Sequence, residues 1–147
     1  MQTINGYAKV VRMNWKKNRM YKQTDGLNYS LIEAINEFSN LVKKSGNILF
    51  IVEGKKDKKA LLNLGIKNIL DISGRRLTDI VDCILSSNFR QIVVLTDFDR
   101  EGKKKHKILV KLFEINGIKV NSQLRRKFIS LFKIHKIEEI NSLTAAL

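Results

Sequence analysis

Two uninterrupted apolar runs stand out in the hydropathy pattern of the chain. Residues 48–52 read Ile-Leu-Phe-Ile-Val, and residues 92–95 read Ile-Val-Val-Leu. Short runs of this kind without a polar position predict strands that are buried on both faces, as in a parallel sheet. Residues 66–70 and 118–120 are shorter candidates for strands. The pattern therefore predicts a mainly parallel sheet of about four strands.

Between these strands, apolar residues recur with the spacing of amphipathic helices. Ser30 and Glu33 form a capping-box pattern at the start of the first helix, which would end near Lys44. Further helices are expected at 55–64, from Ser73 to Leu85, and after Gly102 as far as residue 115. In the last two of these, the positions expected to face the core are Leu77, Ile80, Val81, Ile84, Leu85, Ile108, Leu109, Leu112 and Phe113.

The C-terminal tail predicts two more helices. The first would pack Leu124, Phe128, Leu131 and Phe132 inward and leave Arg125, Arg126 and Lys127 outside, and the second would bury Ile137, Ile140 and Leu143. Strands that alternate with helices specify right-handed βαβ units, so the fold class is α/β. We divide the chain into a basic N-terminal segment with an amphipathic helix (1–45), an α/β domain (46–121) and a C-terminal helical extension (122–147).

The charge of the chain points to a polyanionic partner. Lys and Arg number 28 against 14 Asp and Glu, which gives a net charge of +14. Nucleic acid is the first candidate and an anionic membrane surface the second. No stretch approaches the roughly 18 apolar residues of a membrane span, and the N-terminus lacks the pattern of a signal peptide. We therefore expect a cytoplasmic protein that acts on RNA or DNA, with no membrane partner.

Residues 1–27 combine basic and aromatic side chains and show no clear period. The residues concerned are Lys9, Arg12, Lys16, Lys17, Arg19 and Lys22 together with Tyr7, Trp15 and Tyr21. One interpretation is a basic arm whose rings stack on bases. The other is a solvated terminus, or a pair of strands that packs onto the domain. The sequence leaves both open.

Three residues with metal-binding or reactive side chains are isolated in the sequence. Cys83 falls among apolar residues at helical spacing, which predicts a small buried hydrophobe rather than a reactive thiol. His106 and His135 have no Cys or His partner at zinc spacing, so we do not expect either to bind a metal ion.

Carboxylates follow both of the long apolar runs. Asp97, Asp99 and Glu101 come after residues 92–95 at alternate positions, and Glu53 followed by Gly54 comes after residues 48–52. If the two strands are neighbours, these acids meet at one edge of the sheet, where ligands bind in open α/β folds. Oxygen-only ligands suit Mg²⁺ or Mn²⁺. A lone carboxylate beside a metal-binding pair is typical of phosphoryl transfer.

The three acids that follow residues 92–95 also have purely structural interpretations. Asp97 or Asp99 taken alone could cap the helix that follows. Glu101 could bind a second ion, or it could simply be favoured near a helix N-terminus by the helix dipole.

The two acidic motifs together resemble the Toprim domain. They are Val52-Glu53-Gly54-Lys55-Lys56-Asp57 and Leu95-Thr96-Asp97-Phe98-Asp99-Arg100-Glu101-Gly102. This domain is shared by type IA and type II topoisomerases, bacterial-type primases, old-family nucleases, recombination mediators and the maturase of 5S ribosomal RNA. The second motif is most similar to that of type IA topoisomerases, with Phe98 in place of proline. The resemblance spans about residues 46–121, and the continuation is similar to small stand-alone archaeal Toprim proteins.

The resemblance implies a Rossmann-like Toprim fold and a set of site residues. Glu53 would be the general acid or base, Asp97 and Asp99 the Mg²⁺ ligands, and Glu101 an auxiliary acid. The catalytic set is thus Glu53, Asp97 and Asp99, and the metal set adds Glu101. The basic residues expected to contact nucleic acid are Lys55, Lys56, Arg75, Arg76, Arg100, Lys103, Lys104 and Lys105.

The family resemblance also narrows the expected function. The chain lacks the separate tyrosine domain of a type IA topoisomerase and the zinc module of a primase. We expect Mg²⁺-dependent phosphodiester chemistry on nucleic acid, as in a small nuclease or a maturase-like RNA-processing enzyme. The alternative is a Toprim module that binds or assembles on nucleic acid without cutting it.

Overall fold

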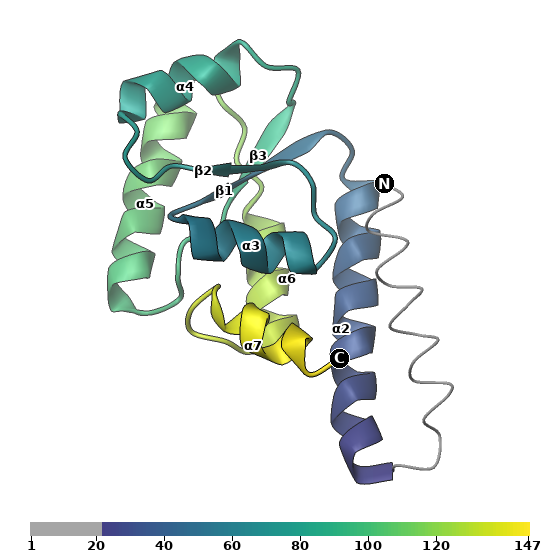
Figure 1. The fold of residues 1–147 in the computed structure, drawn as a ribbon. Helices are drawn as coiled ribbons and strands as arrows, with labels where there is room; N and C mark the ends of the chain where they lie inside the picture. The colour runs from purple at the N-terminus through teal and green to yellow at the C-terminus, as the bar shows by residue number, and fades with distance from the viewer. Residues whose placement is uncertain (1–21) are drawn as a thin grey trace.

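The computed structural model describes residues 22–147 of the chain. The two interpretations of residues 1–27 therefore lie outside the described residues, except that the chain is already helical from Lys22. The described part forms six helices around a three-stranded parallel sheet (Figure 1). In chain order these are α2 (Lys22–Lys44), β1 (Ile48–Val52), α3 (Lys55–Asn63), β2 (Ile69–Asp71), α4 (Leu77–Leu85), β3 (Gln91–Val94), α5 (Arg100–Ile115), α6 (Ser122–Phe132) and α7 (Glu139–Ala145).

The sheet confirms the predicted α/β class with parallel strands. The strand order is β2-β1-β3, with Ile51 of β1 opposite Leu70 on one side and Val94 on the other. The fourth strand expected at 118–120 is reduced to one parallel bridge between Val120 and Ile92. Because all three strands are parallel, their carboxyl ends lie at the same edge of the sheet.

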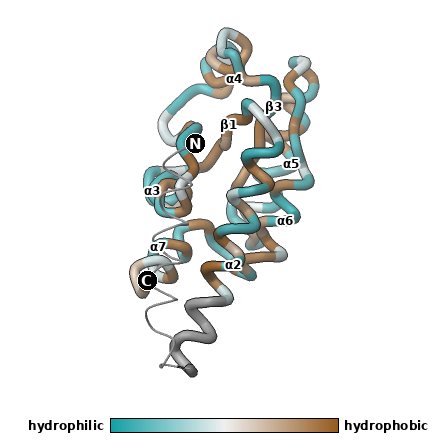
Figure 2. Tube along the Cα trace, turned by 90° about the vertical axis from the view of Figure 1, so that its right-hand side faces the viewer, coloured by the Kyte–Doolittle hydropathy of each residue, from teal (hydrophilic) through white to brown (hydrophobic). Residues whose placement is uncertain are grey.

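Both faces of the sheet are covered by helices, as the uninterrupted apolar runs predict. Alternate residues of β1 point to opposite faces, so that Phe50 packs with α2, α3, α6 and α7, whereas Leu49 and Ile51 pack with α4 and α5. Figure 1 shows α4 and α5 together on one side of the strands. In Figure 2 the strand β1 is hydrophobic throughout, and the helices carry both colours. No helix within residues 22–147 is long and apolar enough to cross a membrane.

An aromatic cluster joins the first and the last helices of the core. The Phe38 ring of α2 lies 5.2 Å from that of Phe128 and 6.0 Å from that of Phe132, both on α6, with edge-to-face geometry. Phe50 of β1 also lies against Phe38, at 6.2 Å. The C-terminal helices therefore share one hydrophobic core with the sheet.

The start of the first helix differs from the sequence prediction. Helix α2 begins at Lys22, so Ser30 is an exposed residue inside the helix and not its N-cap. A capping-box pattern expresses a local preference, and a helix that continues upstream satisfies the same N–H groups with its own carbonyl groups.

Several positions that the helical period assigned to the core are exposed. Leu77 is 42% exposed, Leu85 55% and Ile108 63%, and Cys83 is exposed as well. The prediction of a buried Cys83 is therefore wrong. Helix α4 buries only a narrow stripe, Ile80, Val81 and Ile84, and Cys83 and Leu85 lie roughly a quarter turn to either side of it.

Helix α5 starts in direct contact with the loop that leaves β3. The buried hydroxyl of Thr96 donates to the carbonyl oxygen of Gly102 at 2.7 Å. A Cβ atom on Gly102 would lie 2.8 Å from the Cα of Asp97 and closer still to its carbonyl group. Only glycine lets the first turn of α5 approach the loop this closely.

We expect Gly102→Ala to destabilise the protein by about 1–3 kcal/mol, although alanine is the better helix former by about 1 kcal/mol. The reason is that the new methyl group would push α5 away from Asp97. Gly54→Ala is the matched control, because the nearest atom there, Asp57 Oδ2, is 4.0 Å away. Urea denaturation measures both variants. A Gly102→Ala protein at least as stable as the wild type would contradict this account.

Candidate functional site

The structure brings Glu53 and Asp97 together at the carboxyl edge of the sheet. Glu53 follows β1, and Asp97 follows the neighbouring strand β3. The backbone N–H of Asp97 donates to Oε2 of Glu53 at 3.3 Å. The Glu53 side chain is 21% exposed, so it can reach solvent. Parallel pairing of β1 and β3 thus produces the juxtaposition that the sequence suggested.

Asp99 and Glu101 have structural partners in α5. Asp99 is the N-cap of the helix, and its Oδ1 accepts from the N–H of Gly102 at 2.8 Å. Glu101 is strongly exposed, and its side chain lies 3.8 Å from Nζ of Lys104. The capping interpretation therefore holds for Asp99. Its second carboxylate oxygen, Oδ2, accepts no hydrogen bond from residues 22–147.

The loop between α6 and α7 contributes to the environment of Asp97. The N–H of Ile137 donates to Oδ1 of Asp97 at 2.9 Å, and the N–H of Phe98 donates to the carbonyl oxygen of His135 at 2.6 Å. Burial raises the pKa of Asp97, and the negative charges of Glu53 and Asp99 act in the same direction. The hydrogen bond from Ile137 opposes this shift, so the loop helps Asp97 to remain ionised.

Arg125 donates hydrogen bonds to the end of β3 and to the loop that follows it. The guanidinium donates from Nη1 to the carbonyl oxygens of Val94 and Thr96, at 3.2 and 2.7 Å, and from Nη2 to that of Asp97 at 3.3 Å. It also lies 4.5 Å from the centre of the Phe98 ring. Burial lowers the pKa of Arg125 to about 10, so the group remains charged at neutral pH.

The burial of Arg125 contradicts the prediction that its side chain lies on the solvent-facing side of α6. Arg125 is 6% exposed. Its position borders the apolar stripe of the helix, and hydropathy alone assigns a charged residue at such a border to solvent. A guanidinium group can be buried there because backbone carbonyl oxygens accept its hydrogen bonds.

Asp57 is a further carboxylate at this site, and the sequence motifs gave it no predicted role. It is buried in the first turn of α3, where its Oδ2 accepts from the N–H of Gly54 at 3.2 Å. Burial raises its pKa from 3.8 to about 6, with further contributions from the charges of Asp97, Glu53 and Glu138. The spacing Gly54-x-x-Asp57 in the sequence could have indicated this contact, because it is a helix-capping pattern.

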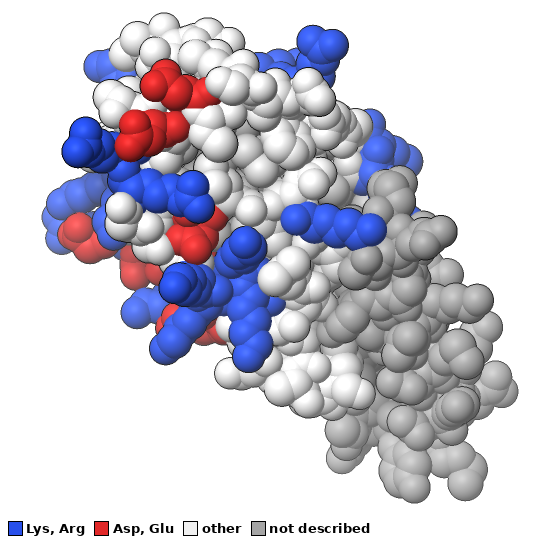
Figure 3. All heavy atoms as spheres, turned by 45° about the horizontal axis from the view of Figure 1, so that its top comes forward, with Lys and Arg blue, Asp and Glu red and all other residues white. Residues whose placement is uncertain are grey.

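All eight basic residues expected to contact nucleic acid are exposed. They lie at the start of α3, in the loop after β2 and in the first turns of α5, around the carboxyl edge of the sheet. Figure 3 shows basic and acidic side chains interspersed on the left of the molecule, the side where Figure 1 places α5. One of the eight, Lys105, also contacts the acidic residues: its Nζ lies 2.8 Å from Oε1 of Glu53.

The donor set at this edge is chemically suited to a hard divalent cation. Glu53, Asp97 and Asp99 offer carboxylate oxygens, which Mg²⁺ and Mn²⁺ prefer. The positively charged ammonium group of Lys105 already contacts the Glu53 carboxylate, as a bound cation could. Within residues 22–147, no three His, Cys, Asp or Glu side chains lie close enough to hold a metal ion together. A bound cation would therefore require side-chain rearrangement.

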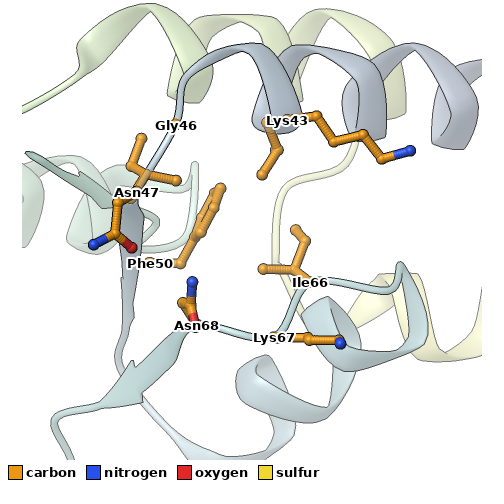
Figure 4. Close-up of a pocket in the computed structure, with 9 residues that line it drawn as sticks. Lys43, Gly46, Asn47, Phe50, Ile66, Lys67 and Asn68 are labelled. Carbon is orange, nitrogen blue, oxygen red and sulfur yellow. The ribbon is translucent and has the colours of Figure 1, made fainter. Parts of the chain in front are cut away.

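A cavity of about 300 Å³ lies elsewhere, at the amino ends of the strands (Figure 4). It is lined by Val42, Lys43, Gly46, Asn47, Ile48, Phe50, Ile66, Lys67 and Asn68. Ile48 is the first residue of β1, whereas Glu53 follows its last. The cavity is therefore not part of the acidic site.

The chain is similar to one known domain family and to several known proteins. The Toprim domain profile matches residues 48–136. A UPF0292 protein of Thermococcus gammatolerans is 33% identical over 127 residues, which make up 84% of this chain and 88% of the relative. A UPF0292 protein of Methanocaldococcus jannaschii is 34% identical over 94 residues, 63% of this chain and 73% of the relative. Among solved structures, a protein from Aquifex aeolicus is 36% identical with a TM-score of 0.61, covering 73% of this chain and 94% of the other.

The raised pKa of Asp57 predicts a specific pH dependence of stability. Between pH 4 and 6 the folded chain keeps a proton that the unfolded chain has lost, so the free energy of unfolding falls as the pH rises through this range. Asp57→Asn should therefore be more stable than the wild type at pH 7–8, by about 1–3 kcal/mol, with the difference vanishing near pH 4.

Thermal or urea denaturation between pH 4 and 8 measures this difference. Asp82→Asn, at an exposed position on α4, is the matched control. A constant difference between Asp57→Asn and the wild type across the range would show that Asp57 does not titrate as described.

Proposed function

The chain belongs to the Toprim domain family, as its sequence motifs predicted, and on that premise we propose that it is a divalent-cation-dependent enzyme that hydrolyses phosphodiester bonds of nucleic acid. Membership of the family indicates a metal-dependent activity related to nucleic acid. The finer proposal is a small nuclease or a maturase-like RNA-processing enzyme.

One observation carries this proposal: Glu53 and Asp97 lie side by side at the carboxyl edge of β1 and β3. Two carboxylates held together repel one another unless a cation or a proton lies between them. We call Glu53, Asp97 and Asp99 the acidic centre. The eight exposed basic residues named above surround it, and we call them the basic rim. A phosphodiester backbone would be attracted to the basic rim, and a cation would offset its repulsion from the acids.

The acidic residues take separate roles in the proposed reaction. Asp97 and Asp99 would hold Mg²⁺ or Mn²⁺ with their carboxylate groups, in each of which Oδ1 also accepts a backbone hydrogen bond. The cation would supply positive charge to the phosphate in the transition state. Glu53 would move a proton, either from the attacking water or to the leaving oxygen, as a water oxygen bonds to phosphorus and the ester P–O bond breaks. Asp57 and Arg125 would position the loops from which these side chains extend.

A second function is favoured by a different observation. Glu53 is already paired with Lys105, and the carboxylates within residues 22–147 do not form a three-ligand group. A protein that binds nucleic acid without cutting it would need no more than the basic rim. The alternative is therefore a non-catalytic Toprim module that binds or assembles on nucleic acid.

Cleavage assays on labelled RNA and DNA with Mg²⁺, Mn²⁺ or EDTA separate the two functions. We expect Glu53→Gln to lower the cleavage rate by about 10²–10⁴, because it removes the titrating oxygen and preserves the shape of the side chain. Asp97→Asn should shift activity toward higher metal concentration. Glu114→Gln, exposed near the end of α5, is the matched control and should cut as the wild type does.

Absence of cleavage on every substrate by the wild type, together with intact nucleic-acid binding, would favour the non-catalytic alternative. Equal cleavage by all of these variants would place the activity at another site.

Binding of nucleic acid should depend steeply on salt. If five or six basic residues of the rim contact phosphates, log K should fall with log[salt] with a slope of about −5 on duplex DNA. Replacing Lys103 and Lys104 by Gln should reduce the slope by about 2. Lys67→Gln is the matched control, since Lys67 lies at the opposite end of the sheet. Fluorescence anisotropy between 50 and 300 mM salt measures the slope, and an affinity indifferent to salt would contradict the proposed rim.

A further inference from the structure

Lys105 reaches from the second turn of α5 to the end of β1. Its Nζ lies 2.8 Å from Oε1 of Glu53, and the other oxygen of the same carboxylate accepts from the N–H of Asp97. Both oxygens of Glu53 are thus engaged by groups of the protein itself. The ammonium group is also attracted by the charges of Glu101 and Asp97. It therefore supplies positive charge to the acidic centre.

The exposure of this ion pair makes it readily broken. The Lys105 side chain is 59% exposed and that of Glu53 21%. Water and salt screen ion pairs of this kind, so their contribution to stability is small. A divalent cation carries twice the charge of the ammonium group and binds several carboxylates at once. A divalent cation can therefore displace Lys105 from Glu53, and the loss of the ion pair lowers the affinity for the cation only slightly.

We propose that Lys105 is an internal counter-ion of the acidic centre, which pairs with Glu53 when no divalent cation is present and leaves Glu53 when one binds. This inference rests on the proposed function, which places the cation at Asp97 and Asp99, beside the Glu53 carboxylate that accepts from the N–H of Asp97. The side chain of lysine is a flexible four-carbon stem. After leaving Glu53, the ammonium group stays beside the site, where it can contact a phosphate group of the substrate. Cation binding is thereby coupled to a change in the basic rim.

The test measures binding of Mn²⁺ alone to the full chain, by electron paramagnetic resonance, at low ionic strength and neutral pH. Lys105→Met keeps most of the stem and removes the competing charge, so we expect it to bind Mn²⁺ about two- to five-fold more tightly than the wild type. Lys107→Met is the matched control: it removes the same charge from an exposed position on the same helix, and its Mn²⁺ affinity should change less than two-fold.

A double-mutant cycle in EDTA tests the ion pair without any metal. We expect Glu53→Gln and Lys105→Met to be non-additive, with a coupling of about two- to five-fold in the unfolding equilibrium constant. Additive effects would show that the ammonium group does not pair with Glu53 and would overturn the inference.

The other outcomes distinguish this inference from the proposed function. If the wild type binds Mn²⁺ and cleaves nucleic acid, but Lys105→Met and Lys107→Met change the Mn²⁺ affinity equally, the counter-ion inference fails and the proposed function stands. If neither the wild type nor Lys105→Met binds Mn²⁺, the metal-dependent function fails, and the exchange of Lys105 for a cation fails with it.

Discussion

Glu53 and Asp97 are like charges that parallel strand pairing forces together, and much of the surrounding structure reduces the resulting repulsion. The register of β1 and β3 fixes the two residues at neighbouring strand ends. The Glu53 carboxylate accepts a hydrogen bond from the N–H of Asp97, and the Asp97 carboxylate accepts one from the N–H of Ile137. Lys105 adds a full positive charge on Glu53. The raised pKa of Asp97 shows that repulsion and burial are only partly compensated. This unrelieved negative charge is what a divalent cation would bind.

The C-terminal helices are part of this arrangement rather than an addition to it. Arg125 on α6 donates to three carbonyl oxygens at the end of β3 and in the acidic loop, and so restrains the backbone from which Asp97 extends. The loop before α7 supplies Ile137, and Asn141 of α7 donates to the carbonyl oxygen of Lys56 in α3. Because these contacts come from residues beyond 121, the geometry of the acidic centre depends on the folding of the tail.

The sequence predicted the parts of the fold that depend on local patterns. Apolar runs located β1 and β3, and carboxylates directly after them indicated the site, because strand ends in parallel sheets meet at one edge. Positions that depend on tertiary contacts were missed. Arg125 is buried because carbonyl oxygens from another element accept its hydrogen bonds, and no pattern within α6 records that. Likewise Cys83 and Leu85 are exposed because α4 buries only the stripe of Ile80, Val81 and Ile84, and these two residues lie to either side of it.

The contrast between a basic rim and an acidic centre argues for a site with two states. A polyanion attracted to the rim would meet uncompensated carboxylates, since Lys105 neutralises only part of their charge. A cation at the carboxylates would remove that repulsion and free the ammonium group for a phosphate, so cation and nucleic acid would each favour the binding of the other. A module that only binds nucleic acid gains nothing from several acids held together in its binding surface. Holding Glu53, Asp57 and Asp97 close together has an energetic cost, and this cost supports the proposed catalytic function over the non-catalytic alternative.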